Sequence, residues 1–312
     1  ENPAIINDIN VSPTGETDFT GRPYYNCAGG NARDSFTCFG PFDFQLTNST
    51  QSPVGVTYSM SLSKLWREND LRFSIGYANT SLEDVTPMTS SVAYSNFTGV
   101  ATIDRNNPTV AQSNHVIPER ITATLRYQPV TIEGGYRFKA SLFINRFQSR
   151  SYSYTYDGEE HGQTPAFTDQ SLLYVPTNAA DPNVVFDGIS PAAFFAITDA
   201  AGCPRGQYCP RNSIDGAWNT SINLKLAQEF PGFAPDHEAE VYMVIKNLGN
   251  LINSKYGIFR EPGFPSMQKV ARLSEIDDDG RYVYDRLYSP RGSSISPYAS
   301  TYEVKFGFYY RF

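Results

Sequence analysis

The sequence predicts an all-β fold, an antiparallel transmembrane β-barrel with short turns at one end and long loops at the other. Three observations predict it. Several segments alternate apolar with polar residues over lengths that cross a bilayer, for which roughly 9 to 11 tilted residues suffice. Short polar turns join these segments in pairs, and long connections separate the pairs. A compact soluble domain seldom carries several structureless loops above about 15 residues, so this rhythm favours a barrel.

The first predicted hairpin begins with a strand whose apolar residues occupy every second position of 54–62. The polar turn 67–70 leads into a second strand, in which the odd positions of 71–77 are apolar. A connection this short makes a hairpin. The same rule predicts five further strands, at residues 121–127, 136–145, 218–226, 239–246 and 301–312.

Long connections are predicted at residues 80–117, 148–216 and 249–299. An eighth, truncated strand is expected at 1–11, which resembles the upper part of a strand that runs into a loop; this opening favours an incomplete chain. Within the second connection, the tyrosines of 151–156 share one face of an extended segment. We expect them in an aromatic girdle at a membrane interface, with a sugar-stacking platform as the alternative.

The composition agrees with strands that show only alternate residues to lipid. The chain is 40% hydrophobic and has 21 tyrosines and 21 phenylalanines, which would supply interfacial girdles. No segment approaches the roughly 20 apolar residues that a spanning helix needs. The formal net charge is −7 and strongly basic patches are absent, so we expect no nucleic-acid partner.

The opposite, polar face of the predicted strands carries many charges, which need water or partners. A wide lumen, wet or filled by a polar plug, accommodates them more easily than the interior of a small barrel. The alternative is the solvent-facing side of a soluble β-sandwich. These charged residues are Arg137, Lys139, Glu238, Glu240, Lys246, Glu303, Lys305 and Arg311.

The four cysteines form two local pairs, Cys27 with Cys38 and Cys203 with Cys209, each in a stretch rich in Gly, Pro and polar residues. Two loops closed by disulfides would suit an exported protein in an oxidising compartment. Zinc is the alternative, but the pairs lie far apart in sequence and lack tight metal-ligand spacing.

The last predicted strand carries a second pattern. Lys305, Gly307, Tyr310 and Phe312 place a polar residue, a glycine and two hydrophobic residues at relative positions one, three, six and eight. This arrangement resembles the C-terminal signal by which the barrel-assembly machinery recognises bacterial outer-membrane β-barrels. The alternative is an ordinary edge strand of a soluble sheet.

Several short motifs resemble the segments beside the last strands of TonB-dependent outer-membrane receptors, particularly the Oar-like subgroup. Residues 247–251, ahead of 255–257, are similar to the penultimate-strand motif of these receptors, and 310–312 to their terminus. The likeness spans most of the chain, and its motifs are specific only collectively. The other stretches that carry it are 20–24, 46–49, 89–91, 104–108 and 171–176.

The resemblance implies that residues 1–312 are the C-terminal portion of one outer-membrane β-barrel domain of roughly 22 strands, of which the plug and the earlier strands are absent from this chain. It implies a location in the outer membrane of a Gram-negative bacterium, with the loops extracellular and in contact with lipid and lipopolysaccharide. It also implies uptake of an unidentified ligand, energised through TonB, which the missing part would contact. The unpaired edges of the first and last strands would meet strands of that part.

Two other classes of function compete with transport. A complete small outer-membrane barrel could act in adhesion or envelope structure, because eight strands is an allowed closed size. The other class is a secreted β-sandwich that binds carbohydrate. In such a protein the terminal Phe312 and the alternation of short turns with long connections would both have to arise by chance. An enzyme is not expected, since the sequence has no Gly-x-Ser-x-Gly elbow, no His-Glu-x-x-His and no phosphate-binding glycine loop.

No cofactor is expected, apart from a weak calcium candidate. Asp277, Asp278 and Asp279 place acidic oxygens next to a glycine turn. The segment lacks the spaced Asp pattern and the distal Glu of an EF-hand, so a solvated turn is the alternative.

Overall fold

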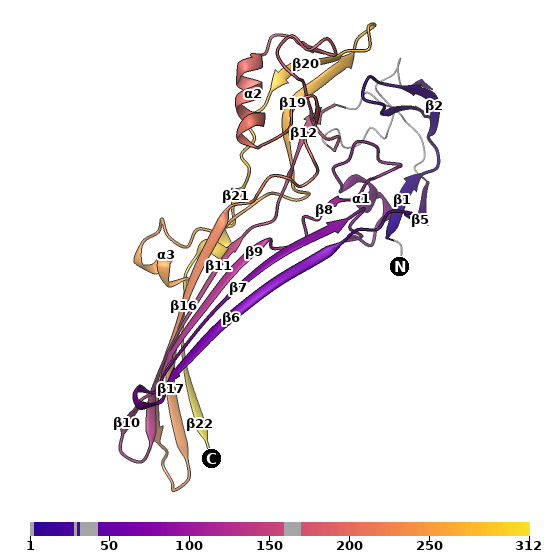
Figure 1. Cartoon of the computed structure of the whole chain (residues 1–312). Helices are drawn as coiled ribbons and strands as arrows, with labels where there is room; N and C mark the ends of the chain where they lie inside the picture. The colour runs from indigo at the N-terminus through magenta and orange to yellow at the C-terminus, as the bar shows by residue number, and fades with distance from the viewer. Residues whose placement is uncertain (1–2, 28–29, 32–42, 159–169) are drawn as a thin grey trace.

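The computed structural model describes residues 3–27, 30–31, 43–158 and 170–312. The fold is all-β, with a long, curved sheet and a smaller folded cap at one end of it (Figure 1). Within the described residues, no helix has the length and apolar character needed to cross a membrane.

Seven long strands form the main sheet in the order β22-β17-β16-β11-β9-β7-β6, and every neighbouring pair is antiparallel. All seven correspond to strands predicted from alternation. The short strands β8 (Ala111–Gln112) and β10 (Val130–Ile132) add to β7 and β11. The seven are β6 (Gly55–Trp66), β7 (Leu71–Asp84), β9 (Glu119–Tyr127), β11 (Tyr136–Gln148), β16 (Trp218–Pro231), β17 (Glu238–Lys246) and β22 (Glu303–Arg311).

The short turns and the C-terminus lie together at one end of this sheet (Figure 1). Between β6 and β7 the turn is a single 3-10 segment, η1 (Arg67–Asn69), and Asp70 follows it at φ 46°. Aspartate tolerates this left-handed conformation better than most residues, which suits it to end the turn. The predicted hairpins are therefore present, and the long connections all emerge at the other end.

The expected eighth strand is not part of the main sheet. Residues near the N-terminus do form a strand, β1 (Ala4–Asp8), but it pairs with β5 (Phe44–Asn48) beside the loop end. The prediction of about eight strands in one wall is wrong by this strand. The reason is that a short alternating segment does not specify which strand it pairs with, and these five residues pair with the equally short β5.

The predicted long connections are present, and with the N-terminal segment they fold into the cap, with short strands and helices of their own. A four-stranded sheet of order β12-β19-β20-β14 contains two parallel pairs, β12 with β19 and β14 with β20. Its strands are β12 (Ser153–Asp157), β14 (Val184–Phe186), β19 (Met267–Ile276) and β20 (Tyr282–Leu287). The other short strands are β2 (Ser12–Thr17), β3 (Pro23–Cys27), β4 (Gly30–Asn31), β13 (Tyr174–Val175), β15 (Gln207–Tyr208), β18 (Arg260–Glu261) and β21 (Ser294–Ile295). The helices are α1 (Ala93–Thr98), α2 (Pro191–Ala200), α3 (Leu248–Ile252) and α4 (Pro297–Ser300).

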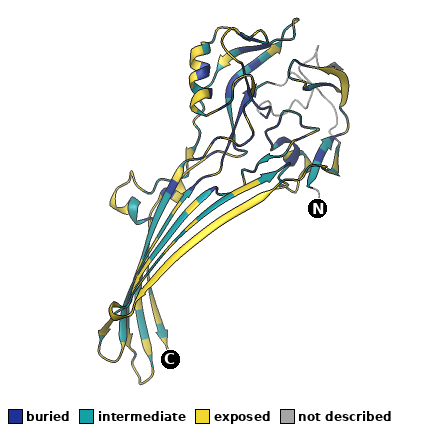
Figure 2. Ribbon diagram, viewed as in Figure 1, coloured by how far each residue is buried: buried dark blue, intermediate teal, exposed yellow. Residues whose placement is uncertain are grey.

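Buried residues gather in the cap, while the long strands are mostly exposed or half-buried (Figure 2). Tyr156, Tyr282, Tyr284 and Phe194 are fully buried in the cap core. The tyrosines of 151–156 are thus core residues, and the expectation of a membrane girdle for them is wrong. Their period-two spacing does mark a strand, β12, but one that lies inside the cap core and pairs in parallel with β19, more than a hundred positions away in the chain.

Arg211 fastens the cap to the loop end of the main sheet. Its side chain is 4% exposed, and its guanidinium lies 2.7 Å from the Asp84 carboxylate at the end of β7. It also donates to the backbone carbonyls of Val85 at 2.6 Å and Asp84 at 2.5 Å. A planar guanidinium with five donors suits such a fork of acceptors. Arg211 therefore ties the 149–217 connection to β7 by an ion pair between a buried arginine and a partly buried aspartate.

Candidate functional site

The register of the seven long strands gathers their apolar residues on one side of the sheet. Leu142 on β11 lies opposite Leu125 on β9 and Leu224 on β16, and Leu224 lies opposite Ile245 on β17. Many of these side chains are exposed, which is uncommon over so wide an area of a soluble protein. The apolar face comprises Val56, Tyr58, Met60, Leu62, Trp66, Leu71, Phe73, Ile75, Tyr77, Ile121, Ala123, Leu125, Tyr127, Phe138, Ala140, Leu142, Ile144, Trp218, Ile222, Leu224, Leu226, Phe230, Ala239, Val241, Met243, Ile245, Val304, Phe306, Phe308 and Tyr310.

Both tryptophans of the chain lie on this side, one near each end of the strands. Trp66 ends β6 at the turn end, and Trp218 begins β16 at the loop end. The Arg146 guanidinium lies 5.0 Å from the ring centroid of Trp218. Tryptophan is enriched where hydrocarbon meets headgroups, so the two positions fit the borders of an apolar band.

The opposite side of the sheet carries ion pairs that run across strands. The Lys139 ammonium on β11 pairs with the carboxylates of Glu229 on β16 and, at 2.8 Å, of Glu240 on β17. Lys225 on β16 lies 3.6 Å from the same Glu240 carboxylate. Along β11, β16, β17 and β22 these charged groups alternate with apolar residues, so each of the four strands has a polar side and a mainly apolar side. Two charged residues lie on the apolar side of the sheet: Lys64 on β6, opposite Phe73, and Arg146 on β11, opposite Ile121. The charges predicted on a single face do lie on one.

The two edges of the long sheet run in the same direction. Each hairpin reverses the chain, and β6 and β22 are the first and seventh strands of an antiparallel order. Within the described residues, β6 pairs only with β7 and β22 only with β17, and the sheet does not close. Direct pairing of β6 with β22 would be parallel. Because the two edges are parallel, antiparallel closure requires an odd number of further strands. The total would then be even, as it is in bacterial outer-membrane barrels.

On the last strand, β22, Gly307 packs under an aromatic ring. Gly307 lies opposite Tyr242 on β17, and a Cβ added to it would come within 2.1 Å of the Tyr242 ring. The Tyr242 ring is flanked by Tyr309, at 5.7 Å between centroids, and by the Lys225 ammonium at 5.1 Å. A larger residue would have to displace the outer end of the Tyr242 side chain, so packing gives a reason for the glycine of the predicted assembly signal.

The other residues of the predicted signal differ in their surroundings. Lys305 forms a 2.9 Å ion pair with Glu303 on the polar side. Tyr310 accepts a hydrogen bond from the backbone N–H of Phe233 at 3.0 Å, and its hydroxyl lies 2.9 Å from Nδ1 of His237 in the β16–β17 turn. Phe312 follows the last strand and is 93% exposed. Phe312 also contacts the β16–β17 turn, because its ring centroid lies 6.5 Å from that of His237, but most of its side chain is exposed.

The motif at 247–251 joins the last two long strands at their loop end. Asn247 follows β17 in a left-handed conformation, at φ 51°, and is 4% exposed. Its side-chain amide donates to the carbonyls of Gly257 at 2.8 Å and Ser300 at 3.0 Å. Its backbone N–H donates to the side chain of Asn223 on β16 at 2.9 Å. Asn247 therefore fixes where the chain leaves β17 and where it returns toward β22.

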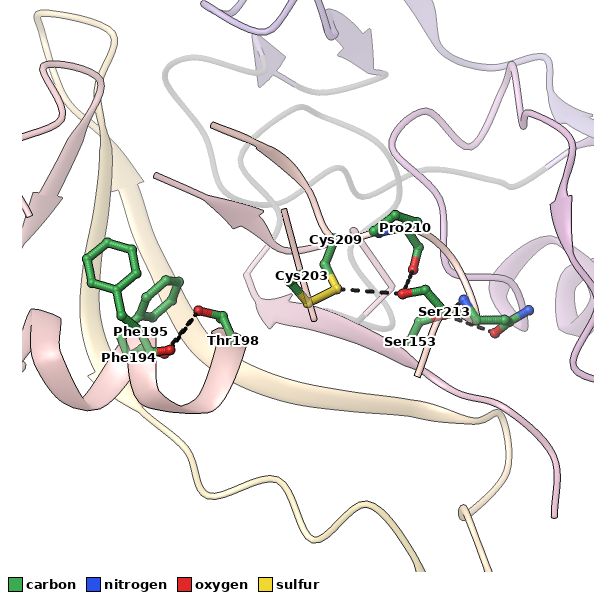
Figure 3. Close-up of a disulfide and its surroundings, with 9 residues drawn as sticks. Ser153, Phe194, Phe195, Thr198, Cys203, Cys209, Pro210 and Ser213 are labelled. Atoms are coloured by element: carbon green, nitrogen blue, oxygen red, sulfur yellow. Dashed lines mark hydrogen bonds between the residues drawn. A yellow bond between two sulfur atoms is a disulfide. The ribbon is translucent and has the colours of Figure 1, made fainter. Parts of the chain in front are cut away.

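A disulfide joins Cys203 to Cys209 just after α2, with their Cα atoms 4.8 Å apart (Figure 3). Both residues are buried in the cap core beside Phe194. The expected pairing of Cys27 with Cys38 lies outside the described residues, because Cys38 is not among them. The disulfide thus closes a loop of the cap, at the end of the sheet opposite the C-terminus.

The acidic segment at 277–279 is the turn between β19 and β20. The Asp277 carboxylate accepts hydrogen bonds from the backbone N–H groups of Asp279 at 3.1 Å and Arg281 at 2.8 Å, and from the Arg281 guanidinium at 2.8 Å. Arg281 also lies 3.2 Å from the Asp279 carboxylate. These contacts account for the turn. Among the described residues, no group of three or more His, Cys, Asp or Glu side chains could hold a metal ion, and calcium stays a prediction.

Burial sets the protonation of the groups in the cap. It raises the pKa of the Tyr154 hydroxyl to about 12, and it raises the pKa values of Tyr282 and Tyr284 well above their ordinary range. Burial lowers the pKa of Arg211, although the Asp84 carboxylate opposes that shift. At neutral pH the tyrosine core is therefore uncharged, and its hydroxyls act as hydrogen-bond donors.

A pocket of about 620 Å³ lies in the cap, where the N-terminal segment meets the connections between β7 and β9 and between β11 and β16. Residues 19–23 precede and begin β3, residues 102–109 belong to the connection between β7 and β9, and β13 and β15 supply Tyr174 and Tyr208. The sequence predicted none of its lining residues as a site. The signal was weak, because the three segments are irregular and lie far apart in the chain.

Comparison of the chain with protein-family models, curated proteins and solved structures found no match.

Proposed function

We propose that this chain is the C-terminal part of the barrel wall of a TonB-dependent outer-membrane receptor, of the Oar-like kind, and serves the energised uptake of a ligand. The observation that carries the proposal is the seven-strand sheet with one continuous apolar face and an ion-paired face behind it. A lipid-facing wall needs this division on every strand. A soluble protein would have to cover the apolar face.

The lengths of the connections support an orientation for the proposed wall. Short turns and the C-terminus at one end fit the periplasmic side, and the folded cap at the other end fits the extracellular side, where it would meet lipopolysaccharide and ligand (Figure 1). The disulfide in the cap also suits an oxidising location.

The partners proposed for the two sheet edges are further strands of the same receptor. Exposed strand edges carry backbone groups that lipid cannot satisfy, so β6 and β22 both need neighbours in a membrane. The ion-paired face would then line a lumen that a plug domain or water fills, and TonB would act through the part that carries the plug. A small eight-stranded barrel with an adhesive or structural role would need one further strand between β6 and β22.

The size of the polypeptide in the outer membrane separates the two barrels. The measurement is the intact mass of the protein that an antibody to this chain recovers from detergent-extracted outer membranes. The proposal predicts a polypeptide several times larger than this chain's 34.8 kDa. An outer-membrane polypeptide of about that mass would contradict it and favour the small barrel.

A matched pair of phenylalanines tests the assembly signal. Phe312 and Phe233 are both almost fully exposed at the turn end. If the barrel-assembly machinery reads Phe312, then Phe312→Ser lowers the amount of folded, heat-modifiable protein in the outer membrane, whereas Phe233→Ser leaves it nearly unchanged. Equal amounts for both variants would count against the signal.

A further inference from the structure

The cap pocket combines an aromatic wall with a polar rim. Phe19, Tyr174 and Tyr208 form the wall; the ring centroids of Phe19 and Tyr174 lie 5.0 Å apart, and those of Tyr174 and Tyr208 lie 5.6 Å apart. Both pairs are edge-to-face, which presents differently oriented ring surfaces to one space. The face of an aromatic ring is electron-rich and attracts weakly positive C–H groups.

Three side-chain amides face the same pocket, from Asn107, Asn183 and Gln207. In the part of the chain that the structure describes, none of these amides makes a hydrogen bond. Each offers one acceptor and two donors in a plane, which matches the spacing of two neighbouring hydroxyl groups on a ring. The Tyr208 hydroxyl also lines the pocket, where it lies 3.0 Å from Oγ1 of Thr20 and 3.0 Å from the Tyr282 hydroxyl.

The charges on the pocket wall cancel. Its lining contains one cation, Arg22, and one anion, Asp104. The Arg22 guanidinium is buried and donates to Oγ of Ser171 at 3.2 Å and to the Tyr156 hydroxyl, while the Asp104 carboxylate accepts from the Tyr25 hydroxyl at 2.9 Å. Both charges are thus held by protein groups. A ligand with a net charge would gain no uncompensated partner here.

From this chemistry we infer that the cap pocket binds a neutral saccharide, with the sugar ring against Tyr174 and Tyr208 and its hydroxyls on the three amides. The volume of about 620 Å³ lies within the roughly 300 to 1,000 Å³ of small-molecule sites and suits a short oligosaccharide. The site goes beyond the proposed function. Only the side of the membrane that it faces depends on that function.

Binding is tested with the full chain, purified in a detergent that has no sugar headgroup. The probes are the neutral disaccharides maltose, cellobiose, lactose and xylobiose, with glucuronic acid and glucosamine as charged comparators. Saturation-transfer NMR detects binding, and isothermal titration measures the dissociation constants. The inference predicts that at least one neutral disaccharide binds and that both charged sugars bind more weakly.

Variants locate the binding. The combined change of Asn107→Ala, Asn183→Ala and Gln207→Ala should weaken binding about a hundredfold, because each lost hydrogen bond costs about fivefold. Thr109→Trp puts a large side chain on the pocket lining and should abolish binding. Asn69→Ala, at the opposite end of the sheet, is the control and should leave the dissociation constant unchanged.

The inference is overturned if no neutral disaccharide binds, if the charged sugars bind as tightly, or if binding survives in both the triple variant and Thr109→Trp. Its failure is distinguishable from failure of the proposed function. A chain that inserts into outer membranes without binding saccharide removes only the inference. A chain that binds saccharide but is absent from outer membranes removes only the proposed function.

Discussion

A single arginine on the apolar face tests whether lipid covers that face. Leu224 lies on the interior strand β16, opposite Leu142 and Ile245. It is the seventh of the 14 residues of β16. At about 3.3 Å per residue it lies roughly 20 Å along the strand from Trp218. With a strand tilt of about 45°, this corresponds to a depth of roughly 14 Å, near the middle of an apolar band about 25 Å tall.

The expected cost follows from that depth. An arginine on the lipid face near the bilayer midplane destabilises an outer-membrane barrel by about 2 to 4 kcal/mol. Ser221→Arg is the control, because Ser221 belongs to the same strand but lies on the polar side, opposite Asn145. There the guanidinium reaches water, so the cost should be small.

The assay is equilibrium unfolding by guanidinium chloride of the protein folded in lipid vesicles, followed by heat-modifiable gel migration. We expect Leu224→Arg to lower the free energy of unfolding by about 2 to 4 kcal/mol and Ser221→Arg to change it little. If the two variants lost equal stability, or if Ser221→Arg lost more, the assignment of the apolar face to lipid would be refuted.

Three further predictions concern the cap and the last strand. Arg211→Met should destabilise the cap by about 3 to 5 kcal/mol in denaturant unfolding, because it leaves the Asp84 carboxylate without its partner. The control Arg205→Gln changes an exposed ion pair and should cost far less stability; similar losses for the two variants would contradict this. Gly307→Ala should lower the free energy of unfolding by about 1 to 3 kcal/mol, because the added methyl group overlaps the Tyr242 side chain. The second change Tyr242→Ala should restore part of that stability, and no recovery would exclude the overlap as the cause. Burial raises the pKa of Tyr154, which lies outside the spanning strands, to about 12. The neutral Tyr154 hydroxyl therefore contributes about 3 kcal/mol to the free energy of unfolding below pH 10, and this contribution is lost as pH rises toward 12. Tyrosinate absorbance and unfolding, measured together against pH, check this, and titration of Tyr154 near pH 10 would contradict it.

The faces of the long strands could be predicted because strand periodicity is local. In β11, for example, Leu142 and Ile144 alternate with Ser141 and Asn145, and the register then places them beside equivalent residues of β9 and β16. The short turns were equally local. What alternation could not supply was closure, because the partner of an edge strand is set by the whole sheet and not by the sequence of that strand.

The cap could not be predicted because its contacts are long-range and its elements are short. Tyr156 packs with Tyr282, and its hydroxyl accepts a hydrogen bond from Arg22, 134 positions away. The spacing of tyrosines in β12 was visible, but an alternating aromatic strand is also typical of a membrane interface. The pocket residues, such as Asn183 and Gln207, gave no pattern, since single amides in irregular segments are common.

The most direct test of the central claim uses the two native tryptophans, both on the apolar face of the long sheet. In lipid vesicles, brominated acyl chains quench tryptophans that touch lipid, and aqueous iodide quenches those that touch water. Trp66→Phe and Trp218→Phe leave one fluorophore each, at opposite ends of the strands. We predict that brominated lipid quenches both and that iodide quenches each only weakly. Strong quenching of both by iodide, with none by brominated lipid, would show that water covers the apolar face and would contradict the membrane wall.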